Sequence, residues 1–440
     1  MAPDATIFAL ASAPGRAGVS VLRISGRAAA RAFGLCAPHT VPPPRLAQLR
    51  ALRRPGDGGL IDKALVLWFP APHSFTGEDV AEFHLHGSRA VLQAVTECLG
   101  ALPGFRIAEP GEFTRRAFMN GKLDLTEVEA LADLIDAETE AQRRQAIRQL
   151  DGELGRLYES WRGRLARVLA HLEAAIDFAD EDLPPDMESR QANDIVALAA
   201  EIAAHLDDRQ CGERLREGFS VAILGPPNAG KSSLLNALAR RDAAIVSSDA
   251  GTTRDVIEVH MDLAGYPVIL ADTAGLRDSA DAVENEGMRR ALARAANADL
   301  KLLVYDGALW PELDGPTKML ADAQALAVVN KADLCPAAGT GGELFISAIT
   351  GAGIPVLLDR IAARIAERFL TPTAPPLTRA RHRAALEESL GHLGAARDPK
   401  EAALRAEDIR LAMRALGRIT GRVDVEDLLD IIFRDFCIGK

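Results

Sequence analysis

The chain has 440 residues, of which 48% are hydrophobic and 26% charged, and its formal net charge is −11 at pH 7. This length is enough for two or three domains, and the acidic balance speaks against a protein that mainly coats nucleic acid, although a local basic surface stays open. No apolar run reaches the roughly 18 residues of a membrane span, and no basic residue precedes the short N-terminal apolar stretch, as a signal peptide would require. A cytoplasmic location without membrane contact is therefore predicted.

The five cysteines are scattered along the chain and form no CxxC pair; they are Cys36, Cys98, Cys211, Cys335 and Cys437. This pattern argues against a disulfide framework and against a structural zinc site. Reduced thiols are expected.

Residues 1–120 alternate short strand-like runs, such as VSVLRI at 19–24 and ALVLWF at 64–69, with turns such as RPGDGG at 54–59. This alternation predicts a mixed α/β domain. Residues 121–215 instead carry apolar residues at three- and four-residue spacings in segments rich in Ala, Leu, Glu and Arg. That spacing predicts amphipathic helices.

Residues 216–371 hold apolar, strand-like runs separated by helix-length segments, which is typical of a mostly parallel α/β sheet. The Pro-rich stretch TPTAPPL, at 371–377, follows as a linker, and residues 377–440 return to the amphipathic helical pattern. We expect the α/β domain to be inserted into a helical domain whose two halves pack together.

The segment GPPNAGKS, at 225–232, follows the apolar run FSVAIL and precedes a helix-like segment, which is the context of a phosphate-binding P-loop. In such a loop the backbone N–H groups cradle phosphates, Lys231 reaches the β and γ oxygens, and the Ser232 hydroxyl binds Mg²⁺. An ordinary Gly-rich turn is a poor alternative, because strand, loop, Lys-Ser and helix all occur in register.

Two segments identify the base as guanine. In NKAD, at 330–333, Asp333 can accept hydrogen bonds from the ring N–H and the exocyclic amine of guanine, a donor pair that adenine lacks. SAITGAG, at 347–353, follows another strand and fits the loop that supports the guanine carbonyl.

Two further segments fit the γ-phosphate and its metal. In DTAG, at 272–275, Asp272 can approach Mg²⁺ through water and the Gly275 amide can sense the γ-phosphate. GTTRD, at 251–255, offers Thr253 as the second hydroxyl on Mg²⁺, in a segment expected to order with GTP.

Hydrolysis of GTP requires a group that orients water, and Leu276 stands where Ras-type proteins have Gln. Glu284 is the best candidate for this role, although spacing alone does not choose it over Asp281 or Glu286. Asn228, inside the P-loop, could hold a monovalent cation beside the phosphates, or it could simply stabilise the turn.

Several blocks of the sequence resemble the bacterial tRNA-modifying GTPase family MnmE, also called TrmE. They are PGRAGVSVLRISG (14–26), SFTGEDVAEFHLHG (74–87), PGEFTRRAFMNGKLDLTEVEALADLIDAET (110–139), the GTP motifs and the terminal FCIGK. The resemblance runs from the first strand to the last residue. It implies an N-terminal tetrahydrofolate-binding and dimerisation domain (1–120), a discontinuous helical domain (121–215 and 377–440) and an inserted Ras-like G domain (216–371).

The motifs and the resemblance together give the expected site residues. GTP binding is expected at Asn228, Ala229, Gly230, Lys231, Ser232, Ser233, Ser247, Ser248, Asp249, Ala250, Gly251, Thr252, Thr253, Asp272, Thr273, Ala274, Gly275, Asn330, Lys331, Asp333, Ser347 and Ala348. The expected metal ligands are Ser232 and Thr253 for Mg²⁺, and Asn228, Ser247, Asp249 and Thr252 for K⁺. The resemblance implies folate contacts at Arg23, Glu82, Lys122 and Lys440, and the expected catalytic residues are Glu284, Lys231 and Cys437.

The implied activity is a potassium-activated GTP hydrolysis that drives tRNA modification by a homodimer. With the FAD- and NADH-dependent flavoprotein MnmG, in a heterotetramer or larger complex, the family adds an aminomethyl or carboxymethylaminomethyl group to carbon 5 of the wobble uridine. The one-carbon unit comes from 5-formyl- or 5,10-methylene-tetrahydrofolate.

Two other functions stay open from the residues alone. One is a ribosome-assembly GTPase with an RNA-binding appendage, and the other is a folate-binding scaffold in which GTP only switches conformation. Cys437 either takes part in the modification as a nucleophile or proton donor, or merely packs near the surface. The arginine-rich helix faces are either tRNA contacts or solvated surface; they hold Arg143, Arg144 and Arg148, and Arg410, Arg414 and Arg418.

Overall fold

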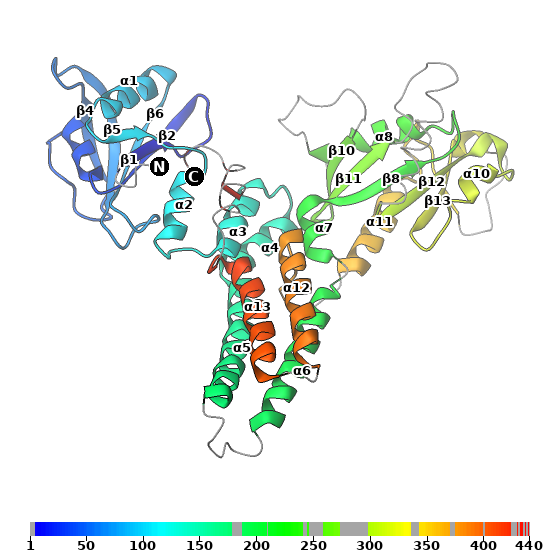
Figure 1. Ribbon diagram of the computed structural model, residues 1–440. Helices are drawn as coiled ribbons and strands as arrows, with labels where there is room; N and C mark the ends of the chain where they lie inside the picture. Colours follow the sequence, from blue (N-terminus) through cyan, green and yellow to red (C-terminus); the bar gives the residue numbers. More distant parts are fainter. Residues whose placement is uncertain are drawn as a thin grey trace, which may run out of the picture. The chain divides into compact units, whose positions relative to one another are not determined.

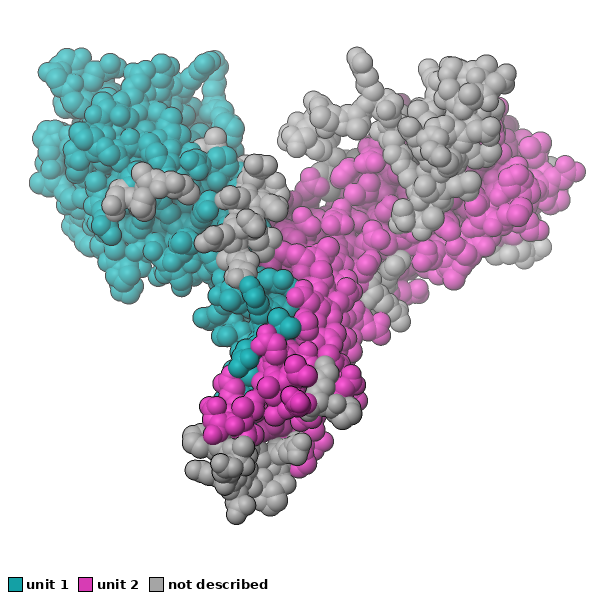
Figure 2. All heavy atoms as spheres, in the orientation of Figure 1, with its two compact units in different colours: residues 1–132, 155–171, 409–440 teal, residues 133–154, 172–408 magenta. Residues whose placement is uncertain are grey.

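Figure 1 shows the protein as a computed structural model of residues 1–440. The structure describes all residues except 1–4, 178–186, 209, 241–243, 246–257, 273–297, 336–342, 370–374, 399–400, 424–428, 430–431, 434–435, 437–438 and 440. The chain forms two compact units, coloured separately in Figure 2. Unit 1 comprises residues 1–132, 155–171 and 409–440, and unit 2 comprises residues 133–154 and 172–408. The four domain ranges expected from the sequence stay a prediction.

Unit 1 contains a seven-stranded sheet in the order β3-β4-β5-β6-β2-β1-β7. Its strands are β1 (Thr6–Leu10), β2 (Ala17–Ser25), β3 (Cys36–Ala37), β4 (Gln48–Arg53), β5 (Leu60–Phe69), β6 (Val80–Gly87) and β7 (Phe105–Ile107). All neighbours pair antiparallel except β1 and β7, which are parallel. With the helices η1 (Ala29–Leu35), α1 (Arg89–Gly100) and α2 (Glu112–Met119), the sheet confirms the mixed α/β character predicted for the N-terminal part.

Residues of alternating burial give this sheet two different faces. In β5, Ala64, Val66 and Trp68 are buried, while Leu65 between them is 44% exposed. The buried residues join a core with η1 and α1, in which the rings of Phe33 and Trp68 lie 5.8 Å apart. A period of two in burial is what a sheet covered on one face requires.

Helices complete unit 1. These are most of α3 (Leu125–Asp136), of α5 (Glu153–Asp177) and of α13 (Ala402–Thr420). The hydroxyl of Thr420 donates to a Glu159 carboxylate oxygen at 3.1 Å, which joins α13 to α5. Near the C-terminus, Phe433 and Phe436 are buried against Leu125 of α3 in one apolar cluster. The apolar-acidic stretch before the tail therefore packs as a buried segment where the structure describes it.

Unit 2 contains the second seven-stranded sheet, in the order β14-β13-β12-β8-β11-β10-β9. Its strands are β8 (Phe219–Leu224), β9 (Ala244–Ile245), β10 (Glu258–Leu263), β11 (Tyr266–Asp272), β12 (Leu300–Asp306), β13 (Ala325–Asn330) and β14 (Leu344–Phe345). Four neighbouring pairs run parallel, which agrees with the predicted mostly parallel sheet, and β10 and β9 add an antiparallel edge. One face packs on α8 (Lys231–Ala239) and α11 (Ile354–Phe369), and the shorter helices are η2 (Gly307–Leu309), α10 (Gly315–Lys318) and η3 (Ala332–Leu334).

The other helices of unit 2 precede and follow this sheet in the chain. They are α4 (Glu140–Leu150), α6 (Met187–Leu206), α7 (Cys211–Glu217) and α12 (Ala380–Ala396). Helices α6 and α12 pack together although the whole sheet separates them in sequence (Figure 1). Asp133 Oδ1 accepts from Arg216 Nε at 3.2 Å and from Arg379 Nη2 at 2.7 Å. One carboxylate therefore binds a residue that precedes the sheet in the sequence and a residue that follows it. Among the described helices, none is long and apolar enough to cross a membrane.

Candidate functional site

The P-loop connects β8 to α8 at the carboxyl end of the central parallel strands. Gly225 and Gly230 have φ of 155° and 86°, a backbone region that L side chains rarely adopt. A Cβ on Gly225 would collide with the carbonyl oxygen of Val304, and one on Gly230 with the side-chain amide of Asn330. Glycine is therefore required twice for the loop to lie this close to its neighbours.

Lys231 is buried at the first position of α8. Its ammonium donates to the carbonyl oxygens of Gly225 and Pro226, both at 2.8 Å. Ser232 and Ser233 follow as exposed residues of the same turn. A helix N-terminus with an ammonium curled over a Gly-rich loop is a phosphate site, and the Ser232 hydroxyl fits the Mg²⁺ that accompanies phosphates.

Asn330, the last residue of β13, ties this loop to the segment after β14. Its Nδ2 donates to the carbonyl oxygen of Ala229 at 2.9 Å, and its Oδ1 accepts from the Ala348 amide at 3.0 Å. The side chain is almost fully buried. Because both ends of the amide are used within the protein, Asn330 acts here as a brace between two loops.

The residues predicted to read the base lie beside this brace. Lys331 has a left-handed backbone, and its ammonium pairs with Asp306 Oδ2 at 2.6 Å. Asp333 is exposed on η3, where its carboxylate is accessible to a ligand. Ser347 is buried, and its hydroxyl accepts from the Thr350 amide at 3.1 Å. The structure thus gathers P-loop, NKAD and SAITGAG at one edge of the sheet.

Part of the predicted site lies outside the described residues. Asp272 ends β11 opposite Ile223 of β8, which places its backbone next to the P-loop strand. The residues 247–253, 273–275, Glu284, Cys437 and Lys440 are not described. The predicted K⁺ ligands Ser247, Asp249 and Thr252, the second Mg²⁺ ligand Thr253 and the catalytic Glu284 therefore stay predictions. Asn228 is described, and it is exposed with a left-handed backbone.

A second cluster of predicted residues lies on unit 1. Arg23 of β2 and Glu82 of β6 face each other in register, with Nε and Oε1 2.9 Å apart. The guanidinium lies 5.3 Å from the ring centre of Phe75 and 5.9 Å from that of Phe113. Both charged side chains are mostly buried, at 23% and 18% exposure. The result is a paired acid and base between two aromatic rings.

The other two folate candidates lie apart from this pair or outside the described residues. Lys122 is exposed, and its ammonium donates to the Pro72 carbonyl oxygen at 3.1 Å. Lys440 is not described, but its neighbour Gly439 is buried so closely against Leu10 that a Cβ would collide with the Leu10 carbonyl oxygen. Leu10 pairs with Leu22, directly before Arg23. Gly439 therefore lies against β1, which is the strand next to β2 and its Arg23.

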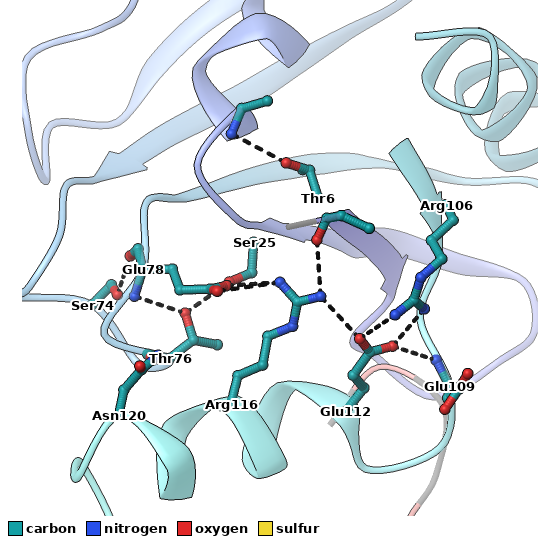
Figure 3. Close-up of polar contacts among 12 residues, drawn as sticks. Thr6, Ser25, Ser74, Thr76, Glu78, Arg106, Glu109, Glu112, Arg116 and Asn120 are labelled. Atoms are coloured by element: carbon teal, nitrogen blue, oxygen red, sulfur yellow. Dashed lines mark hydrogen bonds and ion pairs between the residues drawn. The ribbon is translucent and has the colours of Figure 1, made fainter. Parts of the chain in front are cut away.

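An ionic network fixes the two segments that carry the aromatic rings (Figure 3). Arg116 of α2 donates to Glu78 Oε2 and Glu112 Oε1, both at 2.9 Å, and Arg106 donates to Glu112 Oε2 at 2.7 Å. Burial alone raises the pKa of Glu112, but hydrogen bonds from Arg106, the Glu109 amide and Arg116 outweigh it and hold that pKa below its usual value. The network joins α2, which carries Phe113, to the loop after Phe75.

The sequence reasoning missed both rings and the bracing role of Asn330. Phe75 and Phe113 lie inside blocks that carry the family resemblance, SFTGEDVAEFHLHG and PGEFTRRAFM. The occurrence of an aromatic residue in each of these blocks was the signal that could have indicated contacts with the charged side chains of the expected folate site.

The sheet order, the P-loop between β8 and α8, and the exposed Asp333 define a P-loop protein that binds guanine nucleotides. Family descriptions match both parts of the chain: "GTP-binding protein TrmE N-terminus" over residues 6–122 and "MnmE helical domain" over residues 125–437. The chain belongs to the MnmE family of tRNA modification GTPases, and it is a GTP-hydrolysing enzyme of tRNA modification.

Full-length relatives support this assignment. The tRNA modification GTPase MnmE of Paramagnetospirillum magneticum is 57% identical over 440 residues, covering 99% of each chain. That of Parvibaculum lavamentivorans is 57% identical over 441 residues, covering 99% of this chain and all of the relative. A human mitochondrial protein, 5-taurinomethyluridine-[tRNA] synthase subunit GTPB3, is 49% identical over 99% of this chain and 93% of its own length.

Proposed function

We propose that this chain is a potassium-activated GTPase that acts as a homodimer with the flavoprotein MnmG. Together they add an aminomethyl or carboxymethylaminomethyl group to carbon 5 of the wobble uridine of tRNA, using a tetrahydrofolate one-carbon unit. The observation that carries the folate part is the Arg23–Glu82 pair, held at 2.9 Å between two aromatic rings.

The chemistry of folate matches that pair. The pterin edge presents N–H donors that suit the Glu82 carboxylate and a carbonyl oxygen that suits the adjoining Arg23 guanidinium, whereas the carboxylates of the glutamate tail lie at the far end of folate and need a separate cation. Phe75, which is only partly buried, offers apolar surface for the ring system, whereas the fully buried Phe113 packs beside the Arg23 guanidinium. Lys122 and the terminal Lys440 are candidate cations for the tail, and Cys437 would stand near the one-carbon unit.

The exposed face of the first sheet supports the homodimer. Leu49 of β4 and Leu65 of β5 are cross-strand neighbours and are 68% and 44% exposed. Val19 of β2 is 57% exposed. Apolar side chains paired on one open sheet face are typical of a surface that a second copy covers.

The P-loop supports the potassium part. Asn228 is exposed at a left-handed position of the loop, where its side-chain oxygen is free to face a cation beside the phosphates. Ser247, Asp249 and Thr252 would complete the K⁺ site, Ser232 and Thr253 would bind Mg²⁺, and Glu284 would orient the attacking water. A bound cation beside the β- and γ-phosphates offsets charge that develops during hydrolysis.

Two measurements test the proposal. GTP hydrolysis should be faster in potassium than in sodium buffer, and the Asn228→Ala variant should lose that difference. Equal rates of the unchanged protein in both buffers would refute the potassium site. Nucleosides of tRNA from cells with and without this chain should differ at the wobble uridine by mass spectrometry, and identical nucleosides would refute the modification.

A further inference from the structure

A cavity of about 430 Å³ lies in unit 2, away from the P-loop. Its walls come from α4, from α7, from the turn between β10 and β11, and from Pro375 and Pro376 after the sheet. Helices α4 and α7 both contact β11 at this place (Figure 1). The Ala141 amide of α4 donates to the Gly265 carbonyl oxygen at 3.0 Å, which joins two of the segments that line the cavity. Cavities of this size hold small organic ligands.

One part of the wall is apolar and flat. Leu215 and Leu154 line it together with the ring of Tyr266 and the two prolines. Tyr266 packs against the core of the sheet but is only partly buried, and it also lines the cavity. Aromatic and proline surfaces of this kind accept a planar ring.

The part of the wall that α4 contributes is cationic. Arg144 and Arg148 lie one turn apart on α4 and are 72% and 50% exposed. Arg144 pairs with Glu140 at 2.7 Å and Arg148 with Glu153 at 2.8 Å, and Glu140 also lines the cavity. Exposed ion pairs of this type are weak. A phosphate group can therefore replace Glu140 and Glu153 as the partner of the two arginines.

On the same helix, Gln145 also lines the cavity and offers an unused acceptor. Its Nε2 donates to the Gly212 carbonyl oxygen at 3.0 Å, which fixes the orientation of the amide. Its Oε1 is buried and accepts no hydrogen bond within the described part of the chain. A buried carbonyl oxygen without a donor is costly, and an N–H group of a ligand would satisfy it.

We propose that this cavity binds one unpaired nucleotide of the tRNA substrate. The base enters against Tyr266 and the two prolines, and the adjoining phosphates contact Arg144 and Arg148. A nucleotide combines a planar ring, N–H donors and negative charge, which are the three properties that the cavity walls select. The tRNA itself follows from the family activity, so the inference does not depend on the folate or potassium sites.

The chain provides a matched control for the cationic wall. Arg143 also pairs with Glu140, at 2.7 Å, but it does not line the cavity. We expect the double variant Arg144→Ala/Arg148→Ala of the full chain to bind tRNA about tenfold more weakly at 100 mM salt. Its plot of log affinity against log salt concentration should be less steep, by the equivalent of about one to two released counterions. Arg143→Ala should bind almost as the unchanged protein does. Equal affinities of the double variant and Arg143→Ala would overturn the proposal.

The base contact needs its own test. Tyr266→Leu should weaken tRNA binding roughly fivefold, since stacking of a base on an aromatic ring is lost, while Tyr266→Phe should retain binding. A fully paired RNA duplex should bind both variants equally, because it offers no unpaired base. Equal binding of tRNA to Tyr266→Leu and Tyr266→Phe would refute the stacked base. Free UMP that occupies this cavity should weaken tRNA binding, and UMP binding that leaves the affinity for tRNA unchanged would overturn the proposal.

Discussion

At the scale of single residues, we expect the Asn330 side chain to support both the stability of the fold and the binding of GTP, because it joins two loops of the site. In Asn330→Ala, the buried Ala348 amide and the Ala229 carbonyl oxygen both lose a partner. We expect the free energy of unfolding to fall by about 2 kcal/mol and the affinity for a fluorescent GTP analogue to fall about tenfold. Asn236→Ala, at an exposed position of α8, is the control and should change neither quantity measurably. Similar losses in both variants would contradict the brace.

A second residue-scale prediction concerns the pH dependence of the network around Glu112. Its pKa is lower in the folded chain than the ordinary value of 4.5, so its stabilisation is fully present above that pH and is lost as the pH falls through the folded pKa. Glu112→Gln should cost about 2 kcal/mol at pH 7, because Arg106 and Arg116 lose a charged partner. Urea unfolding should show this deficit shrinking below pH 4. The exposed Glu109→Gln should show neither effect, and a deficit independent of pH would contradict the assignment.

At the scale of elements, continuous apolar runs predicted the central strands β8, β12 and β13, which are covered on both faces. The same reasoning missed β10, where Val259, Met261 and Leu263 alternate with polar residues. That period of two is the mark of a strand covered on one face, and an apolar-run criterion cannot detect it. The sequence analysis did not predict where α3 ends and α4 begins; in the structure, Thr139 and Gln142 form a capping box at the start of α4.

Within the two candidate sites, the local motifs were predictable and the long-range contacts were not. A P-loop needs only a strand, a loop and a helix that are consecutive in sequence, so residues 225–232 sufficed to predict it. The Arg23–Glu82 contact joins residues 59 positions apart. It depends on the register of β2 against β6, and the sequence pattern on either strand does not specify which residues face each other.

Asp133 allows a prediction about how the elements around the second sheet are held. In Asp133→Ala, Arg216 before β8 and Arg379 after α11 both lose the carboxylate that they share. Amide hydrogen exchange should then accelerate several-fold in α7 and at the start of α12, while the strands of the sheet keep their protection. Asp136→Ala, one turn further along α3 and exposed, is the control. Unchanged exchange in α7 and α12 would show that the shared carboxylate is not what holds them.

At the scale of the whole molecule, we expect GTP hydrolysis and wobble-uridine modification to be separable, because the P-loop and the proposed folate site lie in different units. The P-loop and the NKAD segment lie in unit 2, whereas the Arg23–Glu82 pair and the C-terminal tail lie in unit 1. Gly439 has φ of 103° and is packed against the Leu10 carbonyl oxygen, so even one added methyl group displaces the tail that carries Cys437 and Lys440. Where the structure describes it, the C-terminal segment packs against β1 and, in one apolar cluster, against α2 and α3.

We therefore expect Gly439→Ala to abolish wobble-uridine modification and to leave the rate of GTP hydrolysis within about twofold of the unchanged protein. Deletion of residues 437–440 should give the same result. The control is Gly394→Ala, at an open position of α12 where a Cβ meets no atom within 4 Å. It should preserve both activities, since alanine suits a helix better than glycine does. Hydrolysis and tRNA nucleosides would be measured on the same preparations. Loss of hydrolysis together with modification in Gly439→Ala would show that the tail supports the fold as a whole instead of the modification site.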